Sequence, residues 1–193
     1  MTGDYSLKSA SSLAWLTTVL DNFDEFLVDH AANERKASSM ALSLVAHYPD
    51  RPQLINAMID LALEELNHFR QVVRVMNKRA LVLVPDRKDA YVNQLRSHMR
   101  DGSDKYFLDR LLSASVIEAR GAERFALIAD KVEDTDLQSF YAALARSEAS
   151  HHHLFVELAE VYFDSNEVTT RFEEWADIEK QVLEDLPVHA RLH

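Results

Sequence analysis

The stretch Glu65-Leu66-Asn67-His68, inside the helical run from Leu54 to Met76, places a carboxylate and an imidazole three residues apart. Residues three apart lie on nearly the same face of an α-helix, so one metal ion can bind both side chains. We predict a helix from about Pro52 to about Arg79, whose inward stripe is Leu54, Met58, Leu61, Glu65, His68, Val72 and Met76. Glu64 lies about 100° away from that stripe, so Glu65 is the candidate ligand. The same pattern returns at Glu148-Ala149-Ser150-His151. Two such motifs, each accompanied by a lone glutamate on another helix, are typical of a dinuclear metal site in a four-helix bundle.

The two lone glutamates are found upstream of the motifs. Glu34 and Glu118 each lie at the centre of an apolar stripe with helical periodicity. The interval from Glu34 to Glu65 exceeds the interval from Glu118 to Glu148 by a single residue. This matched spacing favours Glu118 as a ligand over Glu123, which we expect to be a partly exposed ion-pair residue.

Composition and periodicity predict an all-α protein. Its 193 residues include only 3 glycines and 4 prolines, and 47% are apolar, which favours helices around a full-sized core. We predict a ferritin-like four-helix bundle with a long crossover segment and an extra C-terminal helix. The chain, 1–193, is expected to form one domain, with its four-helix core over about 21–164 and the C-terminal helix over about 166–186. A short helix over 86–100 is expected within the crossover.

Several classes of protein are excluded or disfavoured by composition. The chain has no cysteine, which rules out disulfides, thiolate metal sites and cysteine-bound iron–sulfur clusters. The sequence has neither a signal-like N-terminus nor an apolar run of about 18 residues, so we expect a soluble, cytoplasmic protein with no membrane contact. A net charge of −11 argues against indiscriminate binding of nucleic acid.

Four glutamates on inward helical faces need a partner for their charge. Buried carboxylates are unfavourable unless they are paired, protonated or bound to metal. Two divalent cations would remove the repulsion, and mixed carboxylate and imidazole ligation suits iron or manganese. The predicted ligands are Glu34, Glu65, His68, Glu118, Glu148 and His151.

Other polar and aromatic residues near these motifs have simpler interpretations. His152 and His153 are expected to face outward or sideways. His30, one turn before Glu34, could support that glutamate but is more simply a core histidine. Tyr141 and Tyr162 are expected to be core residues.

Four longer runs of sequence resemble a known family. The matching runs are Asp29-His30-Ala31-Ala32-Asn33-Glu34-Arg35-Lys36-Ala37, Glu64-Glu65-Leu66-Asn67-His68-Phe69, Glu118-Ala119-Arg120-Gly121-Ala122-Glu123-Arg124-Phe125 and Glu148-Ala149-Ser150-His151-His152. Together they are similar to the tRNA 2-methylthio-N6-isopentenyladenosine hydroxylases, over about residues 12–185.

The resemblance implies a nonheme diiron monooxygenase that hydroxylates the isopentenyl group of the modified adenosine at tRNA position 37. It implies the six ligands named above, two iron ions, dioxygen as co-substrate and an external electron donor such as a reductase or ferredoxin. The partner would be the tRNA anticodon loop, which presents its bases in single-stranded form. A monomer or a small homo-oligomer is expected.

A basic stripe is the candidate surface for tRNA, although the same cations could simply complement a helix C-terminus. Its residues are Arg70, Arg74, Lys78, Arg79, Arg87 and Lys88. Other functions share the metal pattern and stay open at this point. They are a ferritin-like iron oxidase or storage protein, a rubrerythrin-like or manganese catalase-like peroxidase, and a helical scaffold without activity.

Overall fold

The structure is a computed structural model that describes residues 5–193, and all regular structure in that range is helical. The helices are α1 (Leu13–Asp21), α2 (Phe23–His47), α3 (Pro52–Lys78), α4 (Ala90–Ser97), α5 (Ser103–Lys131), α6 (Thr135–Tyr162) and α7 (Ser165–Asp185). The all-α prediction is confirmed. None of these helices combines the length and apolar character that crossing a membrane requires.

The described chain packs as two compact units. One consists of Thr17–Arg87 with His189–Leu192, and the other of the residues up to Leu16, Lys88–Val188 and His193. The single domain expected from the sequence stays a prediction.

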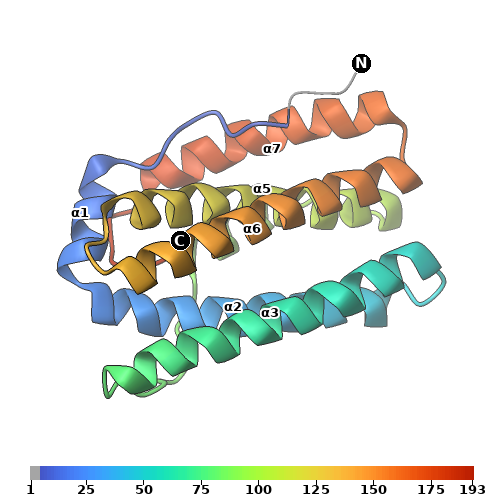
Figure 1. Ribbon diagram of the computed structural model, residues 1–193. Helices are drawn as coiled ribbons and strands as arrows, with labels where there is room; N and C mark the ends of the chain where they lie inside the picture. Colours follow the sequence, from blue (N-terminus) through green and yellow to red (C-terminus); the bar gives the residue numbers. More distant parts are fainter. Residues whose placement is uncertain (1–4) are drawn as a thin grey trace. The chain divides into compact units, whose positions relative to one another are not determined.

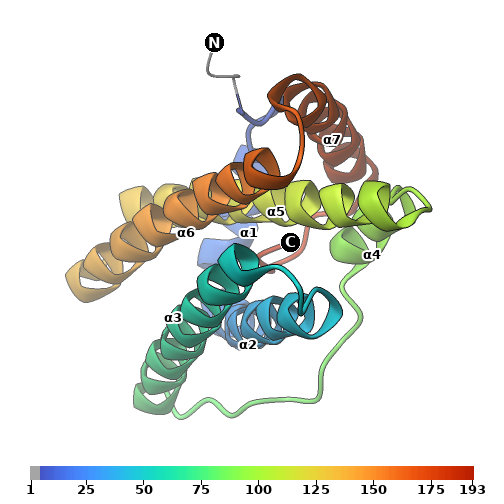
Figure 2. The same cartoon turned by 90° about the vertical axis from the view of Figure 1, so that its right-hand side faces the viewer.

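The first unit is built on the antiparallel pair α2 and α3, which lie side by side (Figures 1 and 2). Pro52 begins α3, where its missing N–H leaves no helical hydrogen bond unmade. The helix ends at Lys78, one residue before the predicted end near Arg79. The predicted inward stripe of α3 is buried throughout: Leu54, Met58, Leu61, Glu65, His68, Val72 and Met76.

Besides His30 and Glu34, the buried face of α2 contains one further polar residue, Ser38. Ser38 is buried although it is polar, because its hydroxyl donates a hydrogen bond to the carbonyl oxygen of Ala62 in α3 at 2.8 Å. This contact joins the two helices one turn beyond Glu34, and it satisfies a polar group that burial would otherwise penalise.

The segment between α3 and α4, residues 79–89, contains no helix, and Figure 2 shows it as an extended strap. The short helix predicted over 86–100 is present but begins later, at Ala90, and ends earlier, at Ser97. Asp89 sets this start, because its side chain accepts a hydrogen bond from the backbone N–H of Val92 at 3.0 Å. Before that point, Asp86 is bound to Arg35 of α2 by an exposed ion pair.

The second unit is built on the antiparallel pair α5 and α6, with α7 packed along α5 (Figure 1). Helix α7 also packs against α4. The C-terminal helix is present, as predicted, and Asp164 caps it by accepting a hydrogen bond from the backbone N–H of Asn166. Phe172, Trp175 and Val182 of α7 are buried. The extra helix therefore supplies a substantial part of this unit's apolar core.

Candidate metal centre

Helices α2 and α3 bring three predicted ligands together in the first unit. Glu34, Glu65 and His68 are all buried, and one ligand atom from each lies within 4.8 Å of the others. Nδ1 of His68 is 3.6 Å from Oε2 of Glu34 and 3.6 Å from Oε2 of Glu65. Nδ1 is therefore the imidazole nitrogen that faces the two carboxylates.

The charges of this group are strongly coupled. Burial alone would raise the pKa of Glu34, but the hydrogen bond with His30 and the nearby imidazole of His68 hold that pKa well below its usual range. Burial lowers the pKa of His68, and the carboxylates of Glu34 and Glu65 more than reverse this and raise it to about 9. A protonated imidazole thus balances the carboxylates, and a bound divalent cation would take the place of that proton.

Helices α5 and α6 bring together the matching group in the second unit. Glu118, Glu148 and His151 are buried, and their ligand atoms also lie within 4.8 Å of one another. Nδ1 of His151 is 3.8 Å from Oε2 of Glu118 and 3.6 Å from Oε2 of Glu148. Each unit therefore contains a half-site, which we define as one lone glutamate and one Glu-x-x-His motif.

The nitrogen and oxygen atoms of the predicted ligands are better placed to coordinate a metal ion than to form hydrogen bonds with one another. Nδ1 of His68 and Nδ1 of His151 are buried and lie 3.6 to 3.8 Å from the carboxylate oxygens that face them, which is longer than an ordinary hydrogen bond. Buried polar atoms are normally satisfied, and a coordinated cation satisfies nitrogen and carboxylate oxygen at once. Carboxylate and imidazole donors without thiolate suit iron and manganese.

Two residues outside the predicted ligand set lie against the α2–α3 half-site: His30, for which the sequence favoured a core position, and Glu64, to which it assigned no role. His30 is fully buried, and its Nε2 is 2.6 Å from Oε1 of Glu34. Oε1 of Glu64 is 3.9 Å from Nε2 of His68, although Glu64 lies off the inward stripe of α3. In the α5–α6 half-site, Oγ of Ser147 is 3.5 Å from Nε2 of His151. The signal in the sequence is position, since each lies four residues before the residue it contacts.

The prediction for His152 was wrong. His152 is buried, and its Nδ1 is 2.8 Å from Oγ of Ser115 and 3.0 Å from the Ser115 carbonyl oxygen. Burial lowers its pKa. His153 is exposed, as expected, and Tyr141 is a core residue.

The remaining predictions for this region have a mixed outcome. Tyr162 is only half-buried. Glu123 is a partly exposed ion-pair residue, as predicted, with Oε2 3.1 Å from Nη1 of Arg120.

All six residues of the predicted basic stripe are exposed. Arg79 is paired with Asp24 at 2.6 Å and lies over the ring of Phe23, and Arg70 donates to the side chain of Asn67. By contrast, Arg74 and Lys78 form no hydrogen bond or ion pair with any described residue. Those two cations are the members of the stripe on α3 that are available to an outside anion.

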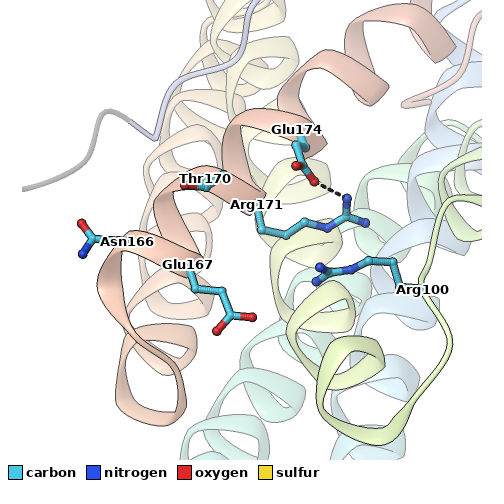
Figure 3. Close-up of a pocket in the computed structure, with 6 residues that line it drawn as sticks. All are labelled: Arg100, Asn166, Glu167, Thr170, Arg171 and Glu174. Atoms are coloured by element: carbon cyan, nitrogen blue, oxygen red, sulfur yellow. Dashed lines mark hydrogen bonds and ion pairs between the residues drawn. The ribbon is translucent and has the colours of Figure 1, made fainter.

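A surface pocket of about 290 Å³ in the second unit does not include any predicted ligand (Figure 3). Arg100 and Arg171 lie in its wall, and both are bound to the buried carboxylate of Asp109. Glu174 accepts a hydrogen bond from Arg171 at 2.6 Å. The two guanidinium groups are therefore largely neutralised by this chain's own carboxylates.

The chain is similar to proteins of known name across nearly its whole length. Residues 3–193 match the family described as tRNA-(ms2io6A)-hydroxylase (MiaE). The tRNA 2-(methylsulfanyl)-N(6)-isopentenyladenosine(37) hydroxylase of Pseudomonas putida is 36% identical over 93% of this chain and 87% of that protein. The enzyme of the same name from Salmonella typhimurium is 34% identical over 68% of this chain and 48% of that protein.

A solved structure shows the fold. "Protein 43 with aldehyde deformylating oxygenase activity" from Synechococcus superposes with a TM-score of 0.92 at 34% identity, over 97% of this chain and 94% of that one. This likeness confirms the ferritin-like fold class. Taken with the match over residues 3–193, it leads to one conclusion: the chain belongs to the tRNA-(ms2io6A)-hydroxylase family.

Proposed function

We propose that this protein hydroxylates the isopentenyl group of 2-methylthio-N6-isopentenyladenosine at position 37 of tRNA, using dioxygen. The observation that carries the proposal is the family match over residues 3–193 in a chain that has both half-sites intact. Of the functions left open by the sequence, iron storage and peroxidase activity share the half-sites but do not account for this match.

The six side chains of the two half-sites are proposed to hold two iron ions, with manganese as the alternative. When bound, the iron supplies the oxidising power for inserting one atom of dioxygen into a C–H bond. The chain's own residues bind the metal through oxygen and nitrogen and keep it in a buried, apolar setting. Such a setting keeps water and side reactions away from the reacting groups.

Electrons must come from outside the chain. Without cysteine, the protein has no thiolates to hold an iron–sulfur cluster. We therefore infer an external reductase or ferredoxin-type donor. A cytoplasmic location and a monomer or small homo-oligomer are part of the same proposal.

The stripe on α3 is proposed to bind phosphates of the anticodon loop. Phosphate contacts supply most of the sequence-independent affinity of a protein for nucleic acid. Arg74 and Lys78 carry the argument, because Arg79 is already paired with Asp24. The exposed cations Arg70, Arg87 and Lys88 extend the same proposal.

Reversing both charges, Arg74→Glu with Lys78→Glu, is expected to weaken tRNA binding at least about tenfold. The affinity should also fall less steeply as the salt concentration rises, because about two phosphate contacts are lost. Iron content should not change. The matched control is Lys105→Glu with Arg146→Glu, which changes the net charge equally at exposed positions of the second unit. Equal tRNA affinity of the two double variants, measured by filter binding, would show that α3 does not dock the tRNA.

The reaction itself is tested by mass spectrometry of nucleosides. Iron-loaded protein, a chemical reductant and air are incubated with tRNA that carries the isopentenylated adenosine. We expect the modified nucleoside to gain the mass of one oxygen atom, with 18O label arriving from labelled dioxygen rather than from water. Iron-loaded protein that consumes dioxygen and leaves the nucleoside unchanged would refute the proposed substrate.

A second candidate follows from the Synechococcus structure, whose name reports aldehyde deformylating oxygenase activity. Its similarity covers nearly the whole of both chains, so an aldehyde is the alternative substrate. Exposed, unpaired cations at Arg74 and Lys78 are a feature that tRNA binding uses and an aldehyde does not. Under the conditions of the nucleoside assay, turnover of a long-chain aldehyde with no change in tRNA would favour this alternative.

A further inference from the structure

The two half-sites have the same ligands but different neighbours. Four residues before the lone glutamate, the α2–α3 half-site has His30 and the α5–α6 half-site has Ala114. Four residues before the ligand histidine, the same positions hold Glu64 and Ser147. In each pair the α2–α3 half-site has an ionisable side chain where its counterpart has a neutral one.

Because of His30, the two carboxylate oxygens of Glu34 have different neighbours. Oε1 of Glu34 is 2.6 Å from Nε2 of His30, whereas Oε2 is the oxygen that faces Nδ1 of His68. The imidazole of His30 is fully buried against the ring of Phe26, with 5.7 Å between the ring centroids. A histidine fixed in this way holds the carboxylate so that one oxygen remains for the metal. Ala114 has no polar atom with which to repeat the contact.

Glu64 acts on the other side of His68. Nδ1 of His68 faces the two ligand carboxylates, and Nε2 points toward Oε1 of Glu64 at 3.9 Å. That distance is an ionic contact rather than a hydrogen bond, and the Glu64 side chain is 49% exposed, which leaves it room to rotate closer. A carboxylate beside the outer nitrogen favours the tautomer with its proton there, which leaves the inner nitrogen bare for a metal. Ser147 offers His151 only a neutral hydroxyl, at 3.5 Å.

We propose that His30 and Glu64 are positioning residues that make the α2–α3 half-site the tighter of two unequal metal positions, which is filled first. The inference rests on the metal centre of the proposed function and adds an order of loading and two residues to it. Partners of this kind typically change metal affinity about 10–100-fold. The α2–α3 half-site has two such partners, whereas the matching positions of the α5–α6 half-site hold no charged side chain. This difference is enough to separate the two binding steps.

The test is titration of metal-free protein with Mn²⁺ under argon, with free Mn²⁺ measured by electron paramagnetic resonance. We expect two binding steps whose dissociation constants differ at least about tenfold. Glu34→Gln should abolish the tighter step and Glu118→Gln the weaker one, which assigns each step to its half-site. Two equal steps in the parent protein, or loss of the tighter step in the Glu118 variant, would overturn the inference.

The positioning residues are then tested separately. His30→Ala and Glu64→Gln are each expected to weaken the tighter step about tenfold, while Ser147→Ala should change it less than about twofold. Because Glu64 is half exposed, its variant remains informative even if the buried His30 variant fails to fold, which circular dichroism would reveal. A Glu64 variant that binds Mn²⁺ like the parent would remove Glu64 from the proposal.

The titration contains no tRNA, so a failed hydroxylation assay leaves this inference intact. Conversely, equal steps would overturn the inference but leave the hydroxylase proposal standing. Only a complete lack of metal binding would contradict both.

Discussion

Glu148→Gln is expected to reduce hydroxylation at least about 100-fold, since loss of a direct ligand should exceed the effect of losing a supporting residue. Oε2 of Glu148 is 3.6 Å from Nδ1 of His151, and the side chain is buried. Glutamine keeps the shape of the side chain but removes the negative charge that is proposed to bind iron. Iron content, measured by plasma emission spectrometry, should therefore fall together with activity.

The control for this variant is Glu157→Gln, which makes the same change at an exposed position of α6. It should retain the iron content and activity of the parent. The iron-free form of Glu148→Gln should also be no less stable to denaturant than the iron-free parent, because the variant removes a buried charge. Retention of two irons by Glu148→Gln would contradict the assignment of Glu148 as a ligand.

Glu179→Gln is expected to lower the free energy of unfolding by about 3 kcal/mol or more, because it leaves a buried guanidinium without its main counter-charge. Arg120 of α5 and Glu179 of α7 are both 0% exposed, with Nε of Arg120 2.7 Å from Oε1 and Nη2 2.9 Å from Oε2 of Glu179. Tyr91 of α4 donates to Oε1 of the same carboxylate at 3.2 Å. One substitution therefore disturbs the contacts of three helices.

Urea unfolding followed by circular dichroism measures this effect. Glu123→Gln is the matched control, since Glu123 also pairs with Arg120 but its side chain is 26% exposed, and it should change stability by less than about 1 kcal/mol. Adding Arg120→Met to Glu179→Gln should recover part of the loss, because no buried charge is then left alone. Equal effects of Glu179→Gln and Glu123→Gln on the free energy of unfolding would show that the buried ion pair contributes no more to stability than the partly exposed one.

The sequence correctly predicted which residues are buried where one helix face is apolar along most of its length. On α3, each residue predicted to face inward is buried, because a period of 3.6 residues repeats over more than six turns and leaves little choice of face. The six predicted ligands fall on such faces. They were found because a charged residue in the middle of an apolar stripe is conspicuous.

Other features depended on contacts that the local pattern does not contain. His152 was expected to face outward, yet α7 covers it, and the rings of His152 and Phe172 are 5.8 Å apart. Glu64 was set aside because it lies off the inward stripe, but a long side chain reaches the outer nitrogen of His68. The start of α4 was predicted at residue 86, but Asp89 caps the helix and Ala90 begins it.

The strap of residues 79–89 is a place where the chain could be cut into two fragments. It is helix-free, and Val82, Leu83 and Val84 within it are exposed, which are properties of sites where proteases cut and chains can be split. A single break there would separate the six proposed ligands into two equal sets, with one lone glutamate and one Glu-x-x-His motif on each fragment. The two fragments could then be produced from separate genes and mixed. Iron bound by the mixture would show whether the fragments reassemble.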